Sequence, residues 1–187
     1  MAIIPNAAPD EKFSPFYRKN KQFCKEFERF IASKNGLVKG KYNACSYLVT
    51  GKIAKPTNWE LVYKKSTYST TGNLWLSSKR QGLFVSVAWK TKRISSSVSN
   101  FSIRKKKLLD NLKIITNQNL SLLWINKKYV IESSNNKSKL IHNLLSILEN
   151  LFHSEEIYQI IYQNDELIIT LHSEKHHFLT FKKLSSI

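Results

Sequence analysis

Two stretches of this chain space their apolar side chains as an amphipathic helix does, and each is followed by several short stretches of strand character. The first helical stretch begins near Ser14, and the second covers Ser138–Leu151. After each of them, apolar and polar residues alternate between polar turns. Hairpin-linked strands between a few helices favour an antiparallel sheet with helices over one face. The sequence therefore predicts an α+β fold, with sheets built from hairpins and a C-terminal meander and covered by these two helices.

The N-terminal helix carries its own start and stop signals. Ser14 suits the N-cap, Pro15 suits the first helical position, and Gly36 is placed to end the helix. A stripe at helical spacing is predicted to face the core, and it contains Phe16, Phe23, Phe27, Phe30 and Ile31.

Strand patterns occupy the region from Lys41 to Thr91. The predicted strands are Ala44–Thr50, Trp59–Lys64, Asn73–Ser77 and Leu83–Lys90. The last two are predicted to form a hairpin around the loop Lys79–Gly82, with a core face made of Leu74, Leu76, Val85, Val87 and Trp89. The opposite face of that hairpin carries Trp75 and Phe84, which are either exposed or covered by a helix.

These strands are followed by a serine-rich loop, Ser95–Ser102, and a short basic helix, Arg104–Lys113, that carries Leu108, Leu109 and Leu112. A hairpin of Ser121–Ile125 and Tyr129–Glu132 is expected before the helix Ser138–Leu151, whose apolar stripe contains Leu140, Ile141, Leu144, Leu145, Leu148 and Leu151. The expected closing meander has three strands, Ile157–Tyr162, Leu167–His172 and Phe178–Phe181.

Positive charge is confined to one part of the chain. Up to Lys113 there are 23 Lys and Arg residues against 6 Asp and Glu, and from Ile114 onward there are 7 against 7. Between Leu61 and Leu109 there are 11 basic residues and no carboxylate. The chain thus divides into a basic half, 1–113, and a neutral half, 114–187, which at 187 residues are expected to share one compact domain.

A surface with an excess of positive charge attracts polyanions such as nucleic acid. Codon usage in an A/T-rich genome accounts for 25 Lys against 5 Arg, but it does not account for the segregation of charge. Arginine reads guanine and phosphate bidentately, so its scarcity argues against sequence-specific recognition.

The pattern predicts a non-enzymatic protein that binds nucleic acid with little sequence specificity. Amines would follow the phosphates while rings stack on unpaired bases. The candidate nucleic-acid-binding residues are Lys64, Lys65, Trp75, Lys79, Arg80, Phe84, Lys90, Lys92, Arg93, Arg104, Lys105, Lys106 and Lys107.

Two other functions stay open. The first is an adaptor module whose basic face docks an acidic protein partner or an anionic membrane surface. The second is a small nuclease that uses His172, His176 and His177, which surround one predicted turn. The chain lacks GxxxxGK[ST], GxGxxG and HExxH patterns, so no cofactor, metal ligand or catalytic residue is assigned.

The N-terminal residues lack the basic and apolar regions of a signal peptide, and no window approaches the length of a transmembrane helix. The two cysteines, Cys24 and Cys45, lack a CxxC spacing and are too few for a disulfide scaffold. These features favour a cytoplasmic protein.

Overall fold

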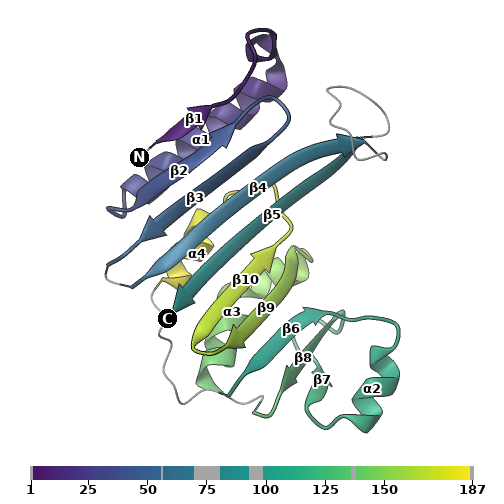
Figure 1. Ribbon diagram of the computed structural model, residues 1–187. Coiled ribbons are helices and arrows are strands. Elements are labelled where there is room, and N and C mark those ends of the chain that lie inside the picture. The colour runs from purple at the N-terminus through teal and green to yellow at the C-terminus, as the bar shows by residue number, and fades with distance from the viewer. Residues whose placement is uncertain (1, 56, 70–80, 93–98, 136–137, 186–187) are drawn as a thin grey trace. The chain divides into compact units, whose positions relative to one another are not determined.

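The computed structural model describes residues 2–55, 57–69, 81–92, 99–135 and 138–185 (Figure 1). These residues form four α-helices and ten strands, and every strand pairing for which a register is defined is antiparallel except one. The predicted α+β class is confirmed. The chain divides into two compact units, which are described separately. Unit 1 is Met1–Ala88 with His172–His176, and unit 2 is Trp89–Leu171 with His177–Ile187.

Unit 1 is a sheet with one long helix on it. Its elements are β1 (Ile3–Pro5), a 3-10 turn (Asp10–Phe13), α1 (Pro15–Ala32), β2 (Leu37–Tyr42), β3 (Tyr47–Ile53), β4 (Trp59–Ser69) and β5 (Gln81–Lys92), whose residues from Trp89 onward belong to unit 2. The strands lie in the order β1-β2-β3-β4-β5. β1 runs parallel to β2, whereas β3 is antiparallel to both β2 and β4.

Helix α1 covers one face of this sheet because its buried side chains recur three and four positions apart. The Ser14 hydroxyl caps the helix by accepting a hydrogen bond from the Phe16 amide at 3.2 Å. The buried stripe consists of Tyr17, Asn20, Cys24, Phe27 and Ile31. At Gly51 of β3, an added Cβ would lie 2.4 Å from Ile31 Cδ1, so glycine lets the helix approach the strand closely.

The predicted aromatic stripe of this helix is correct only in part. Phe27 and Ile31 are fully buried and Phe23 and Phe30 are half-buried, but Phe16 is exposed. The prediction followed ring size, whereas the buried face includes the smaller side chains Asn20 and Cys24. Strand β2 was not among the strands predicted from the sequence.

The hairpin predicted around Lys79–Gly82 is corrected at its second strand. Gln81 and Gly82 already belong to β5 and not to a loop, and β5 follows β4 in the sheet order. Val85, Val87 and Trp89 are buried as expected. Leu74, Leu76 and the strand Asn73–Ser77 lie outside the described residues.

Unit 2 combines antiparallel strands with helices of its own. Its elements are β6 (Phe101–Lys105), α2 (Asp110–Thr116), β7 (Leu120–Leu122), β8 (Tyr129–Ser133), α3 (Lys139–His153), β9 (Ile157–Gln163), β10 (Glu166–Leu171) and α4 (Phe178–Leu184). The strands lie in the order β10-β9-β6-β8-β7. The Ser138 hydroxyl caps α3 by accepting from the Ile141 amide at 3.3 Å, and all six predicted stripe residues of α3 are buried.

Three predictions in this half are wrong. Arg104 and Lys105 belong to strand β6, and the helix α2 begins only at Asp110. Ser102, placed in the predicted serine-rich loop, lies in β6 as well. The segment Phe178–Phe181, expected as a third meander strand, is the start of helix α4, because Phe181 and Leu184 are buried three residues apart.

The predicted pairing of the hairpins in unit 2 is confirmed, but the first strand of one is shorter than predicted. β7 pairs with β8 and ends at Leu122, so Leu123–Ile125 are not in a strand. β9 pairs with β10 across the two-residue turn Asn164–Asp165. Both turn residues have positive φ, as the tightest hairpin turns require. In the part of the chain that the structure describes, no helix has the length and apolar character needed to cross a membrane.

Candidate functional site

Four lysines of unit 1 project from the sheet face opposite α1. Tyr42, Tyr47 and Tyr63 contact rings of α1, so alternate positions on the same strands must face the other way. Four of the residues at these outward-facing positions of β2, β3 and β4 are lysines. We call Lys39, Lys41, Lys52 and Lys64 the lysine face.

The strand register places these lysines in neighbouring rows. Lys41 pairs with Leu48, and Leu48 pairs with Lys64, so Lys41 and Lys64 lie two strands apart, at about 10 Å. Lys39 and Lys41 are about 7 Å apart along one strand. Among the described residues of β2, β3 and β4, Glu60 is the one carboxylate, and its Oε2 lies 3.5 Å from Lys52 Nζ. The lysine face thus keeps a net positive charge.

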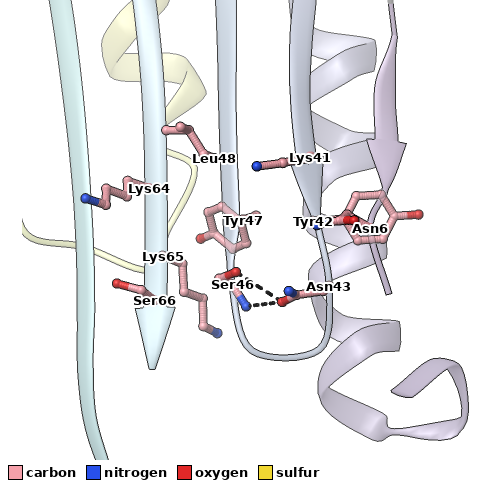
Figure 2. Close-up of a pocket in the computed structure, with 10 residues that line it drawn as sticks. All are labelled: Asn6, Lys41, Tyr42, Asn43, Ser46, Tyr47, Leu48, Lys64, Lys65 and Ser66. Carbon is pink, nitrogen blue, oxygen red and sulfur yellow. Dashed lines mark hydrogen bonds between the residues drawn. The ribbon is translucent and has the colours of Figure 1, made fainter. Parts of the chain in front are cut away.

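A pocket of about 180 Å³ opens at one end of this surface, beside the β2–β3 turn (Figure 2). Its cationic lining comes from Lys41, Lys64 and Lys65. The other lining residues are Asn6, Tyr42, Asn43, Ser46, Tyr47, Leu48 and Ser66. Three amines beside amide and hydroxyl groups form a suitable environment for an anion that accepts hydrogen bonds.

Two asparagines fix the turn beside this pocket. The Asn43 Oδ1 accepts hydrogen bonds from the amides of Cys45 and Ser46, at 2.9 and 2.7 Å. From α1, the buried Asn20 amide donates to the carbonyls of Asn43 and Ala44, at 2.9 and 3.1 Å. The turn is therefore anchored to the helix, and its geometry does not depend on a ligand.

The three pocket lysines differ in their surroundings. Lys64 and Lys41 are exposed. Lys65 is largely buried, with its Nζ 3.9 Å from Glu174 Oε2, and burial lowers the pKa of its amine. Lys65 is thus tied to the segment His172–His176, and the exposed charge at the pocket comes from Lys41 and Lys64.

The same segment holds His176 in unit 1. The His176 ring stacks on Phe23 with centroids 3.9 Å apart, and its Nε2 lies 2.9 Å from Glu26 Oε2. The Tyr63 hydroxyl donates to the His176 carbonyl. In unit 2, His177 Nε2 lies 2.7 Å from Glu156 Oε2. Each of these two histidines is therefore engaged by a carboxylate of its own unit.

The basic residues predicted in unit 2 have mixed surroundings. Lys90 is half-buried. Lys92 lines a hollow of about 560 Å³ that also contains Asp165 and Glu166. The carboxylates make this hollow a poor site for a polyanion.

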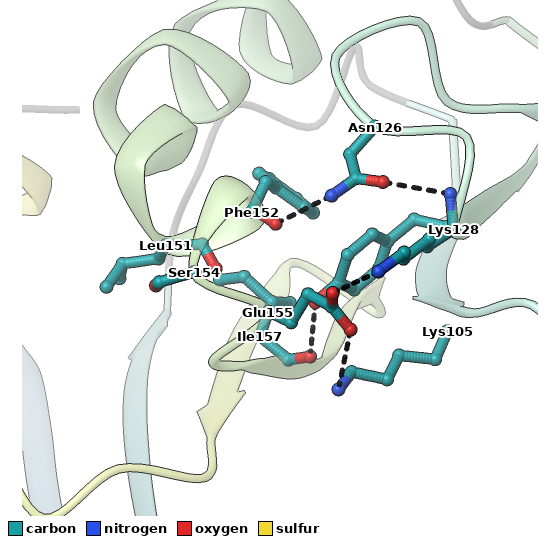
Figure 3. Close-up of polar contacts among 9 residues, drawn as sticks. Lys105, Asn126, Lys128, Leu151, Phe152, Ser154, Glu155 and Ile157 are labelled. Atoms are coloured by element: carbon teal, nitrogen blue, oxygen red, sulfur yellow. Dashed lines mark hydrogen bonds and ion pairs between the residues drawn. The ribbon is translucent and has the colours of Figure 1, made fainter.

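Arg104 and Lys105 have partners within the protein. Arg104 Nη1 and Nη2 donate to Asp110 Oδ2 and Oδ1, at 2.6 and 2.9 Å. Glu155 pairs with Lys105 at 3.9 Å and also with Lys128 (Figure 3). Lys106 and Lys107 are exposed.

Trp75, Lys79, Arg80 and Arg93 lie outside the described residues, and so does the side chain of Phe84. Conversely, the sequence prediction missed Lys39, Lys41 and Lys52. The alternation Val38-Lys39-Gly40-Lys41-Tyr42 is the signal that could have identified Lys39 and Lys41, since it places both lysines on one face of a strand.

Metal and thiol chemistry find no support in the described residues. Nowhere in the described ranges do three His, Cys, Asp or Glu side chains gather as a metal site would require. Burial raises the pKa of the Cys24 thiol to about 12, which leaves it without nucleophilic thiolate at neutral pH.

Comparisons of this chain with known protein families, with curated proteins and with solved structures give no match, so the geometry of its own residues is the ground for a functional inference.

Proposed function

We propose that this protein binds nucleic acid through its phosphates, without enzymatic activity and with little sequence preference, and that the lysine face of unit 1 makes the contacts. The observation that carries the proposal is the strand register, which gathers Lys39, Lys41 and Lys64 on one face with a single carboxylate among them.

The chemistry of the lysine face fits backbone recognition. Lysine offers a flexible point charge and no planar fork for a base edge, so it favours phosphate contacts over base reading. The pocket at Lys41, Lys64 and Lys65 is roomy enough for one anionic group. A nuclease would need carboxylates to hold a metal ion at the phosphate, and Glu60 is engaged by Lys52.

The test is a titration of fluorescently labelled single-stranded and duplex oligonucleotides at several salt concentrations. With about 3 to 4 phosphates neutralised by the lysine face, the log–log slope on duplex is expected near −3, and shallower on single strands. Reversing Lys39, Lys41 and Lys64 to Glu should weaken binding to every sequence alike, and it should flatten the single-strand slope by about 2.

The control variant changes the same charge elsewhere in unit 1, at Lys12, Lys21 and Lys25, which are all exposed. It should retain most of the affinity, because those lysines lie before or on α1 and not on the opposite sheet face. Equal losses in both variants would show that only net charge matters, and the absence of binding at low salt would refute the proposal.

A further inference from the structure

Helix α2 in unit 2 has the reverse of the usual burial pattern. On the helix, Leu112 and Ile115 are 67% and 83% exposed, and Leu108 and Leu109, which directly precede it, are 95% and 65% exposed. The buried residue of the helix is Asp110, which is 1% exposed. Helices of globular proteins normally bury the aliphatic residues and expose the acid. We call these four aliphatic residues the α2 patch.

Polar contacts hold the start of α2 in place. The Asp110 carboxylate accepts two hydrogen bonds from Arg104 of β6 and one from the Lys107 amide at 2.6 Å. These bonds fix the start of the helix against the sheet. The side chains of the α2 patch are therefore not needed to anchor the helix, and they project outward from it.

The α2 patch continues toward β7. Helix α2 packs beside β7, on which Leu122 is exposed. Trp124 follows two residues later and is 69% exposed. An exposed aliphatic group of this size in one small region marks an interaction surface.

The charge around the α2 patch is positive. From Arg104 to Ile131 the sequence contains one carboxylate, Asp110, and its buried contacts remove it from the surface. Lys106, Lys107 and Lys113 are exposed beside the aliphatic side chains. Lys105 and Lys128 share the single carboxylate of Glu155 (Figure 3).

We propose that the α2 patch docks on an anionic lipid bilayer surface. Its aliphatic side chains would enter the boundary between headgroups and acyl chains while Lys106, Lys107 and Lys113 contact lipid phosphates. Trp124 suits the same depth, because tryptophan prefers membrane interfaces. The inference is independent of the proposed function, since it concerns other residues in the other unit.

The composition of the surface favours lipid over a protein partner. The cores of protein interfaces are enriched in aromatic residues and arginine and depleted in lysine. Here the α2 patch is leucine and isoleucine with Trp124 beside it, and the charges around it are lysine. Side chains that protrude as far as Leu108 suit a fluid layer that closes around them.

The experiment is sedimentation of the full chain with vesicles of phosphatidylcholine alone and of phosphatidylcholine mixed with phosphatidylserine. Binding is expected to the mixed vesicles and not to the neutral ones, and it should weaken with salt. The double variant Lys106→Gln, Lys107→Gln should weaken binding about thirtyfold, at roughly fivefold per lysine. The double variant Leu108→Ser, Leu112→Ser should weaken it by at least about tenfold.

Matched controls come from α4 of the same unit, where Leu179 and Lys182 are exposed. Leu179→Ser and Lys182→Gln should bind like the unmodified chain. Circular dichroism of each variant shows whether it is still folded. Nucleic-acid titration of each variant shows whether it has lost polyanion binding in general or only the binding to lipid.

Three outcomes would overturn the inference. The first is the absence of binding to mixed vesicles, and the second is equal binding to both kinds. The third is self-association of the protein that the double variant Leu108→Ser, Leu112→Ser abolishes in sedimentation equilibrium while vesicle binding stays unchanged. A second copy of the chain would then be what covers the α2 patch.

Discussion

Asp110 combines a negative charge with nearly complete burial. Its carboxylate accepts hydrogen bonds from Arg104 and from the Lys107 amide, and these bonds hold its pKa well below the usual range for an aspartate. A carboxyl with a depressed pKa in the folded state stabilises the fold when ionised. That contribution is present above about pH 4, the pKa of an unfolded aspartate, and is lost as the pH falls through the folded-state pKa.

We therefore expect unit 2 to lose stability on acidification below about pH 4, and Asp110→Asn to remove most of that pH dependence. At neutral pH the substitution should cost about 3 kcal/mol, since it leaves the Arg104 charge without its partner. Urea unfolding at neutral and acid pH measures both effects. Asp10→Asn, at an exposed position, is the control, and a similar response of the two variants would contradict the role given to Asp110.

Helices α2 and α3 show how much the burial of leucine can differ between two helices of one unit. Leu144 on α3 is completely buried, whereas Leu112 on α2 is mostly exposed. Leu144→Ala should cost about 2–5 kcal/mol through lost burial and the cavity left behind. Leu112→Ala should change the free energy of unfolding by less than about 0.5 kcal/mol. Denaturant unfolding of the two variants side by side checks this, and comparable losses would mean that the α2 patch is buried.

Elements with strong local signals were predictable from the sequence. The caps Ser14 and Ser138 and the wide stripe of α3 determine two helices, and the Asn164–Asp165 turn determines a hairpin. These features depend on residues close together in the chain. They therefore needed no knowledge of tertiary partners.

The elements that the sequence did not predict depend on distant or ambiguous contacts. The helix predicted at Arg104–Lys113 begins only at Asp110 because Arg104 and Lys105 lie in β6, which pairs with the distant strands β8 and β9. Helix α4 was mistaken for a strand because Phe178–Phe181 is too short for its period to be decided. The lysine face was found only at Lys64, since recognising Lys39 and Lys41 required strand β2.

At the scale of the whole molecule, neither unit is a continuous segment of the chain. Unit 1 is completed by His172–His176, which stands between β10 and α4 of unit 2 in the sequence. His176→Ala should remove the stacking on Phe23 and the contact with Glu26, at a cost of about 1–2 kcal/mol.

Hydrogen exchange should locate this loss in α1 and β4 of unit 1, which carry the residues that contact the His176 ring, and leave β9 unchanged, although β9 is nearer to His176 in sequence. His153→Ala is the control, because the His153 ring is largely exposed and the substitution removes a 3.8 Å contact with Glu149 at the surface. Deprotection confined to β9 and β10 would contradict the assignment of His172–His176 to unit 1.

Because His172–His176 is synthesised late, unit 1 is completed only near the end of translation. The contacts of His176 with Tyr63 and Glu26 span 113 and 150 residues. Ala88 leaves the ribosome 84 residues before His172, a delay of about 4–17 s at the usual translation rates. Throughout that interval Phe23 and Tyr63 lack the segment that covers them, so the nascent chain carries an incomplete aromatic surface until translation is nearly finished. A chaperone that acts on nascent chains would have its longest opportunity at that surface.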